Sequence, residues 1–223
     1  MWITFWQVYP DFASLHPGYG VGVACKERSG LRVEWSIFNV FQMELKTMVR
    51  YRRVWVDGGT YFFTLTLIDR HASYLTQYVD ELRQAFRESR KNHPFKIEAI
   101  VVLPEHLHMI LTLPEGVSDY ARRIQSIKAI FSRKVANLIP GCCPNNRGEY
   151  NLWQRRYWEH LIRDEEDFNS HVDYIHYNPV KHKLVDEVKA WPYSSFHHYV
   201  RERILPQDWA GYAFTSNSNF GER

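Results

Sequence analysis

The sequence predicts an α+β protein with a four-stranded antiparallel sheet in the chain order β-α-β-β-α-β, the order of ferredoxin-like folds. Three observations lead to this prediction. Four apolar runs rich in β-branched and aromatic residues alternate with segments of helical periodicity. Only Pro104 and Glu105 separate the two middle runs, which predicts a tight connection between two strands. A further helical segment follows the last run, so the predicted domain is the ferredoxin-like sheet with one extra helix.

The strands are predicted from β-rich runs bounded by turn residues. The first run follows the turn signal Asp57-Gly58-Gly59, and Pro114-Glu115-Gly116 ends the third. In chain order, we expect strands at 60–69, 95–103, 106–113 and 156–162. The third strand, 106–113, would be central in the sheet.

The helices are predicted from apolar residues spaced three or four apart. We expect helices at 73–91, 119–138 and 164–177. Ser118 is a suitable N-cap for the second helix, and acidic residues in the first turn of the third suit the helix dipole. Pro179 should end the third helix, because the residue before a proline disfavours the α conformation.

The segment "PEHLHMILTLPEG" (104–116) carries the first candidate site. Side chains alternate between the faces of a strand, so His106 and His108 point to one side and Leu107, Met109 and Leu111 to the other. We expect the leucine side to pack against the first two helices and the histidines to lie on the open face of the sheet. Two imidazoles so placed are a compact pair of metal ligands; the alternative is two polar residues on a solvated face.

The predicted third helix carries the second part of the candidate site. Tyr174 and Asn178 are four residues apart and therefore share one helical face. A tyrosine can act as a nucleophile when it is activated, and an asparagine oxygen can complete a ligand set that suits Mg²⁺ or Mn²⁺. The alternative for Tyr174 is a half-buried core tyrosine. Tyr177 is a rival nucleophile by type, but it lies about 60° around the helix.

Several longer segments resemble one family in its own order, over about residues 48–211. They are "YRRVWVDGGTYFFTLTL", "IVVLPEHLHMILTLPEG", "LWQRRYWEHLIRDEEDF", "HVDYIHYNPVKHKLV", "WPYSSFHHYV" and "DWAG". These segments resemble the REP-associated tyrosine transposases, members of the HUH single-tyrosine transposases related to the insertion-sequence 200/605 group. The resemblance implies metal-dependent endonuclease and strand-transfer activity on single-stranded DNA, with recognition of palindromic hairpins.

The resemblance also implies roles for individual residues. His106 and His108 match the two histidines of the HUH motif, Tyr174 matches the nucleophile, and Asn178 matches the third metal ligand. Attack by Tyr174 would leave a 5′-phosphotyrosine and a free 3′-OH. Glu105, next to His106, is a candidate for orienting a ligand imidazole, and its alternative is a solvated acid at a strand start.

Basic residues interleaved with aromatic residues suggest contacts to phosphates and unstacked bases. The candidates for DNA binding are Tyr51, Arg52, Arg53, Arg122, Arg123, Arg155, Arg156 and Lys181. The resemblance places Arg52 and Arg53 at the hairpin. The formal net charge of +3 permits a nucleic-acid partner without proving one.

Domain organisation follows from where the pattern begins. Residues 1–47 lack periodicity and lie outside the resemblance, so we expect a poorly structured extension upstream of a natural start at Met48; the alternative is a genuine extension that packs on the domain. Residues 48–200 would form the nuclease domain and 201–223 a C-terminal tail.

The three cysteines fit neither a disulfide framework nor a zinc finger, and no run reaches the length of a membrane span, so we expect a cytoplasmic protein. The resemblance favours a monomer over a homodimer.

Other functions explain less of the sequence. A histidine-triad hydrolase needs a third alternating histidine, and position 110 is isoleucine. A zinc hydrolase would use His106 and His108 but has no use for Tyr174 and Asn178. A domesticated hairpin-binding protein without transposition activity remains the alternative, although pure binding does not require all four residues.

Overall fold

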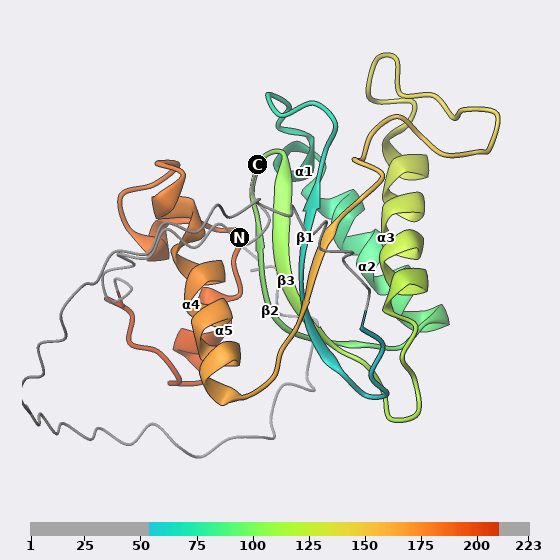
Figure 1. Cartoon of the computed structure of the whole chain (residues 1–223). Coiled ribbons are helices and arrows are strands. Elements are labelled where there is room, and N and C mark those ends of the chain that lie inside the picture. The colour runs from blue at the N-terminus through green and yellow to red at the C-terminus, as the bar shows by residue number, and fades with distance from the viewer. Residues whose placement is uncertain (1–53, 210–223) are drawn as a thin grey trace, which may run out of the picture. The chain divides into compact units, whose positions relative to one another are not determined.

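The computed structural model describes residues 54–209, and within them it confirms the four-stranded antiparallel sheet (Figure 1). The strands are β1 (Thr60–Thr66), β2 (Lys96–Val102), β3 (His106–Thr112) and β4 (Trp158–Leu161). Their order across the sheet is β2-β3-β1-β4, and each neighbouring pair is antiparallel. The strand that carries the two histidines, β3, is therefore central, as predicted.

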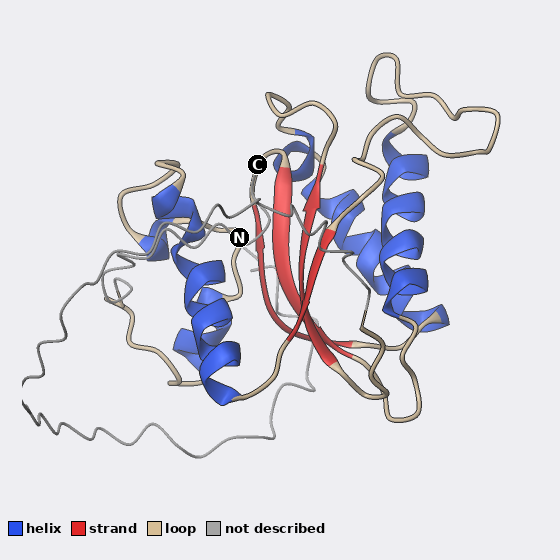
Figure 2. Cartoon of the chain, in the orientation of Figure 1, coloured by secondary structure: helices blue, strands red, loops and turns tan. Residues whose placement is uncertain are grey.

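Helices cover both faces of this sheet (Figure 2). They are α1 (Tyr74–Gln77), α2 (Val79–Asn92), α3 (Tyr120–Val135), α4 (Glu165–Lys181), the short 3-10 helix η1 (Val188–Ala190) and α5 (Phe196–Arg201). The helices α2 and α3 lie side by side on one face, and α4 lies across the other. None of the helices in the described part of the chain is long and apolar enough to span a bilayer.

Two of the helix predictions differ from the structure. The expected helix 73–91 is interrupted at Tyr78, whose backbone (φ −111°, ψ 42°) leaves the helical region between α1 and α2. The N-cap of α3 is Asp119 rather than Ser118, because the Asp119 carboxylate accepts a hydrogen bond from the Arg122 backbone N–H at 3.1 Å. A carboxylate at this position also interacts favourably with the helix dipole.

The prediction that Pro179 ends the third helix is wrong. The helix α4 continues through Pro179 to Lys181. A proline removes one backbone donor, and near a helix end that loss affects a single turn. The next turn is closed by other donors: the His182 N–H bonds to the Asn178 carbonyl at 3.0 Å and the Leu184 N–H to the Pro179 carbonyl at 2.9 Å.

The segment after η1 pairs with the outer edge of β2. The Val102 N–H donates to the Tyr193 carbonyl and the Ser195 N–H to the Ile100 carbonyl, both at 2.8 Å. The Trp191 indole N–H also bonds to the Val102 carbonyl at 3.0 Å. These bonds satisfy an edge that would otherwise be open to unwanted pairing. The predictions for residues 1–47, and for the tail beyond residue 209, lie outside the described residues.

Candidate functional site

The two histidines share one face of the central strand, as their spacing predicts. In the register between β1 and β3, His108 lies opposite Thr64 and His106 opposite Thr66. The expectation that this face is open is wrong, because α4 packs over it and both histidines are 0% exposed. The imidazoles therefore lie in the layer between the sheet and α4.

Apolar neighbours on the histidine face explain why a helix covers it. Phe62, Ala99, Val101 and Ile110 lie on this face and pack with Val172 and Ile175 of α4 in one buried core cluster, together with other residues. A sheet face with this much apolar surface must be buried against another element. The near-continuous apolar runs of β1 and β2 were the sequence signal for a sheet covered on both sides.

His106 has one nitrogen held by an acid and the other available as a ligand. Its Nδ1 lies 3.0 Å from Glu105 Oε1, and Arg70 lies 3.6 Å from the same oxygen. Burial alone would raise the pKa of Glu105, but the hydrogen bond from His106, together with the charge of Arg70, holds that pKa below its usual value. The ionised Glu105 accepts from Nδ1–H, which leaves the lone pair on Nε2. This Nε2 is buried and has no hydrogen-bond partner among residues 54–209.

His108 has a comparable arrangement. Its Nδ1 lies 2.9 Å from Thr64 Oγ1, so the hydroxyl can hold the Nδ1–H tautomer. The rings of His106 and His108 have centroids 4.9 Å apart and planes 80° apart. Two imidazoles that bind one cation through nitrogens about 2.1 Å away hold their ring centres roughly 5 Å apart. The pair therefore fits a shared metal ion.

The helix α4 brings Tyr174 and Asn178 to the same layer. Both are buried, at 3% and 0% exposure, and the Tyr174 ring lies 5.2 Å from the His108 ring. The Lys181 ammonium donates to the Tyr174 hydroxyl at 3.2 Å and lies 4.7 Å from the centre of its ring. Tyr177 is half-buried against the core cluster, about 60° around the helix from Tyr174. Tyr174 and Asn178 of α4 therefore lie in the same buried layer as His106 and His108, with the Tyr174 ring next to His108.

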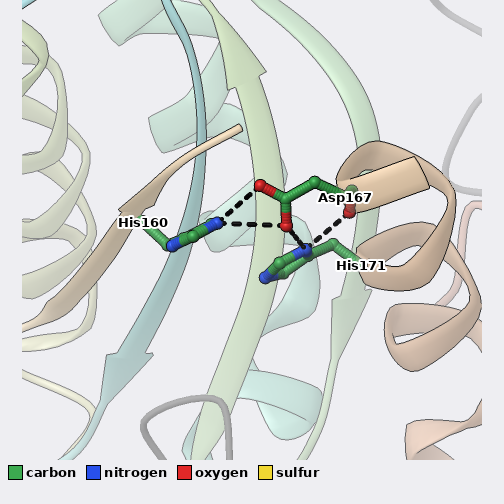
Figure 3. Close-up of side chains that lie close together, drawn as sticks. All are labelled: His160, Asp167 and His171. Carbon is green, nitrogen blue, oxygen red and sulfur yellow. Dashed lines mark hydrogen bonds and ion pairs between the residues drawn. The ribbon is translucent and has the colours of Figure 1, made fainter. Parts of the chain in front are cut away.

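A hydrogen-bonded cluster lies one turn further toward the start of α4 (Figure 3). His160 of β4 donates from Nε2 to the two Asp167 carboxylate oxygens at 2.8 and 3.1 Å. His171 Nδ1 donates to the Asp167 carbonyl at 2.7 Å and lies 3.2 Å from its carboxylate. The three side chains are of metal-ligating types within 4.8 Å of one another. Each nitrogen that faces Asp167 carries a proton, so we interpret the cluster as a hydrogen-bonded brace between β4 and α4.

The spacing of polar residues along α4 is a sequence signal for this arrangement. Asp167, His171, Tyr174, Asn178 and Lys181 follow one another at spacings of four, three, four and three residues. Such spacings place all five side chains along one stripe of α4. A polar stripe directed at a buried sheet face is unusual, which makes this helix a candidate for a functional role.

The candidate DNA contacts fall into three groups. Tyr51, Arg52 and Arg53 lie outside the described residues. Arg123 is buried and donates to the carbonyls of Pro94 and Asp119 at 3.0 and 2.7 Å, so its guanidinium is used within the fold. The remaining candidates are exposed: Arg122, Arg155, Arg156 and Lys181.

Comparisons with known proteins agree with this fold. The family model described as "Transposase IS200 like" matches residues 56–178. The "REP-associated tyrosine transposase" of Escherichia coli is 45% identical over 164 residues, which are 74% of this chain and 92% of that protein. A "Putative REP-associated tyrosine transposase" of Haemophilus influenzae is 48% identical over 170 residues, 74% of this chain and 94% of that protein.

A solved structure described as a REP-associated tyrosine transposase bound to a REP hairpin is also similar. It superimposes with a TM-score of 0.69 at 43% identity and covers 79% of this chain and 98% of that one. The four-stranded sheet with its helices is therefore the fold of a transposase. The chain is a member of the IS200-like transposase family, within the group of REP-associated tyrosine transposases.

Proposed function

We propose that this chain binds the hairpin of a repetitive palindromic element and cleaves adjacent single-stranded DNA by attack of Tyr174, with the help of a divalent cation. The observation that carries this proposal is the meeting of Tyr174, Asn178, His106 and His108 in one buried layer. The solved structural relative is described as bound to a REP hairpin, which supports the hairpin as partner. We expect the active form to be a monomer.

The cleavage step is a transesterification. The Tyr174 hydroxyl oxygen attacks the phosphorus, a P–O bond to tyrosine forms, and the P–O3′ bond breaks. The phenolic proton is lost and the leaving 3′ oxygen gains one, so the step has no net proton change. One phosphodiester replaces another, and a later attack by a 3′-OH can therefore rejoin strands without an added energy source.

Lys181 is placed to assist the nucleophile. Its ammonium donates to the Tyr174 hydroxyl, and charge-assisted hydrogen bonds of this kind stabilise negative charge on the acceptor oxygen. Lys181 is also exposed, so its positive charge is available to an approaching phosphate.

Phe62 packs against the rings of both Tyr174 and His108, with ring centroids 6.0 and 5.6 Å away, and fixes their relative position.

The residues for a cation are His106, His108 and Asn178. The buried Nε2 of His106 and its Glu105-bound Nδ1 supply the tautomer that a metal ligand needs. Two imidazoles with an amide oxygen suit Mn²⁺ or Mg²⁺. When bound, such a cation supplies Lewis-acid polarisation of the scissile phosphate.

The exposed arginines provide a surface for the DNA backbone. Arg155 and Arg156 immediately precede β4, and Arg122 lies in the first turn of α3 with its side chain 66% exposed. Guanidinium groups bind phosphates with paired hydrogen bonds, which fixes position rather than sequence. We therefore assign these three residues to backbone contacts.

The test is formation of a covalent protein–DNA adduct. The wild-type protein, incubated with a labelled hairpin carrying a single-stranded extension and Mn²⁺, should give an adduct that survives denaturing electrophoresis. Tyr174→Phe should abolish the adduct, and the matched control Tyr177→Phe should retain it. His106→Ala should lose cleavage and keep hairpin binding.

Two outcomes would contradict this proposal. An undiminished adduct from Tyr174→Phe would refute the assigned nucleophile. Hairpin binding without any adduct from the wild-type protein, in either Mn²⁺ or Mg²⁺, would favour the domesticated hairpin-binding protein instead.

A further inference from the structure

We infer that His182 is an additional ligand of the divalent cation held by His106, His108 and Asn178. This inference rests on the proposed metal site and adds a third imidazole to it. His182 lies beyond the end of α4, at the C-cap position. Its position relative to His106 carries the argument.

The ring geometry around His106 is the first observation. The His182 and His106 ring centroids are 5.0 Å apart, almost the same separation as the 4.9 Å between His106 and His108. The planes are inclined by 64° and 80°, so neither neighbour stacks face to face on His106. The separations of 4.9 and 5.0 Å from His106 to these two rings each match a pair of imidazoles that share a cation through nitrogens about 2.1 Å away.

The backbone after α4 holds His182 at this place. Its N–H bonds to the carbonyl of Asn178, the residue that supplies the amide ligand. The next residue, Lys183, has a left-handed backbone with φ of 57°, a conformation that usually favours glycine. The Lys183 and Leu184 N–H groups close the turn on Val180 and Pro179 at 2.9 Å each. The turn therefore fixes His182 one helical turn beyond Asn178.

The histidines within α4 have other partners. His171 donates from Nδ1 to the Asp167 carbonyl. His176 is fully buried, its Nε2 lies 3.0 Å from the Ser195 hydroxyl, and its ring packs against Tyr199 and Phe196. Burial lowers the pKa of His176 to about 3, so it is a neutral core residue. His182, just beyond α4, has a ring contact to His106, and its Nε2 is buried.

A third imidazole would change which cation the site prefers. Imidazole nitrogen ligands favour Mn²⁺ and Co²⁺ over Mg²⁺, which prefers oxygen ligands and keeps its waters. We therefore expect the wild-type chain to bind Mn²⁺ and Co²⁺ well above Mg²⁺. Loss of His182 should reduce this discrimination.

The experiment measures Mn²⁺ binding to the full chain without DNA. Titration calorimetry would give the Kd, and pulsed EPR of the bound Mn²⁺ would report how many imidazole nitrogens coordinate it. His182→Ala should raise the Kd by about tenfold or more and remove one imidazole from the EPR count. The matched control is His93→Ala, because His93 is also a helix C-cap histidine whose backbone N–H bonds to a carbonyl, that of Ser89, at 2.8 Å.

The outcomes separate this inference from the proposed function. If His106→Ala weakens Mn²⁺ binding but His182→Ala changes neither the Kd nor the imidazole count, His182 is not a ligand and the proposed site stands. If neither variant affects Mn²⁺ binding, the proposed metal site and this inference both fail. Thermal unfolding of each variant shows whether the fold is lost. His182→Asn is a second variant that keeps a polar side chain, and its EPR spectrum should also show one imidazole fewer than the wild type.

Discussion

Replacing Asp167 by asparagine removes a negative charge from the brace that joins β4 to α4. The Asp167 carboxylate accepts hydrogen bonds from His160 at 2.8 Å, from the Arg163 side chain at 3.0 Å and from the Arg163 backbone at 3.1 Å. Its side chain is only 7% exposed. Burial opposes ionisation, but these hydrogen bonds outweigh it and lower the pKa of Asp167 from 3.8 to about 2.

The stability that depends on this charge follows from the pKa difference. A shift of nearly two units, at about 1.4 kcal/mol each, corresponds to roughly 2 kcal/mol of unfolding free energy. Because the folded-state pKa of Asp167 is the lower one, this contribution is fully present above about pH 4. It is lost as the pH falls toward about 2, and roughly half of it remains at pH 3. Asp167→Asn should therefore lower the Tm by roughly 4–8 °C at neutral pH.

Urea denaturation of the wild type and Asp167→Asn at pH 7.5 and pH 3 tests this reasoning. The difference in unfolding free energy should be about 2 kcal/mol at the higher pH and about half of that at the lower pH. Glu166→Gln is the matched control, since Glu166 is an exposed acid in the same first turn of α4, and it should change little. An equal difference at both pH values, or no destabilisation at pH 7.5, would refute the charged brace.

Two further predictions concern the nucleophile and the DNA surface. Lys181→Met should slow adduct formation by about tenfold to a hundredfold, the effect of losing a charge-assisted hydrogen bond, while hairpin binding persists. The control Lys183→Met, at an exposed neighbour, should leave the rate of adduct formation unchanged. Equal rates for the two variants would remove Lys181 from the mechanism. The double variant Arg155→Gln/Arg156→Gln should weaken hairpin binding and lower the slope of log K against log salt by up to about 2, measured by fluorescence anisotropy. An unchanged slope would show that these arginines do not contact phosphates.

The sheet could be predicted because its information is local. Strand positions follow from residue type and from turn residues at their ends, and the predicted run 106–113 differs from β3 (His106–Thr112) by one residue. The alternation of His106, Leu107 and His108 was enough to assign the two faces of that strand. The break at Tyr78 could not be predicted, because the apolar spacing of the segment continues through it.

The placement of α4 could not be predicted in the same way. Helical periodicity shows that a segment has an inner side, but it does not say which face of the sheet that side contacts. The contacts of His108 with Thr64 and of Asp167 with His160 join elements whose relation depends on the strand register and on helix docking. For this reason the groups that contact His106 and His108 were not predicted, Glu105 excepted.

The stripe on α4 links catalysis to the docking of one helix. Tyr174 and Asn178 are separated by four residues, or about 6 Å along the axis, so a rigid helix moves the nucleophile and the amide ligand together. Their positions over β3 depend on contacts at both ends: Asp167 with His160 at one end, and the turn at His182 beside His106 at the other. A variant that loosens the first contact, such as Asp167→Asn, should therefore lower adduct formation and Mn²⁺ affinity together, although Asp167 touches neither group. Lys181→Met, which leaves the helix docked, should lower adduct formation alone.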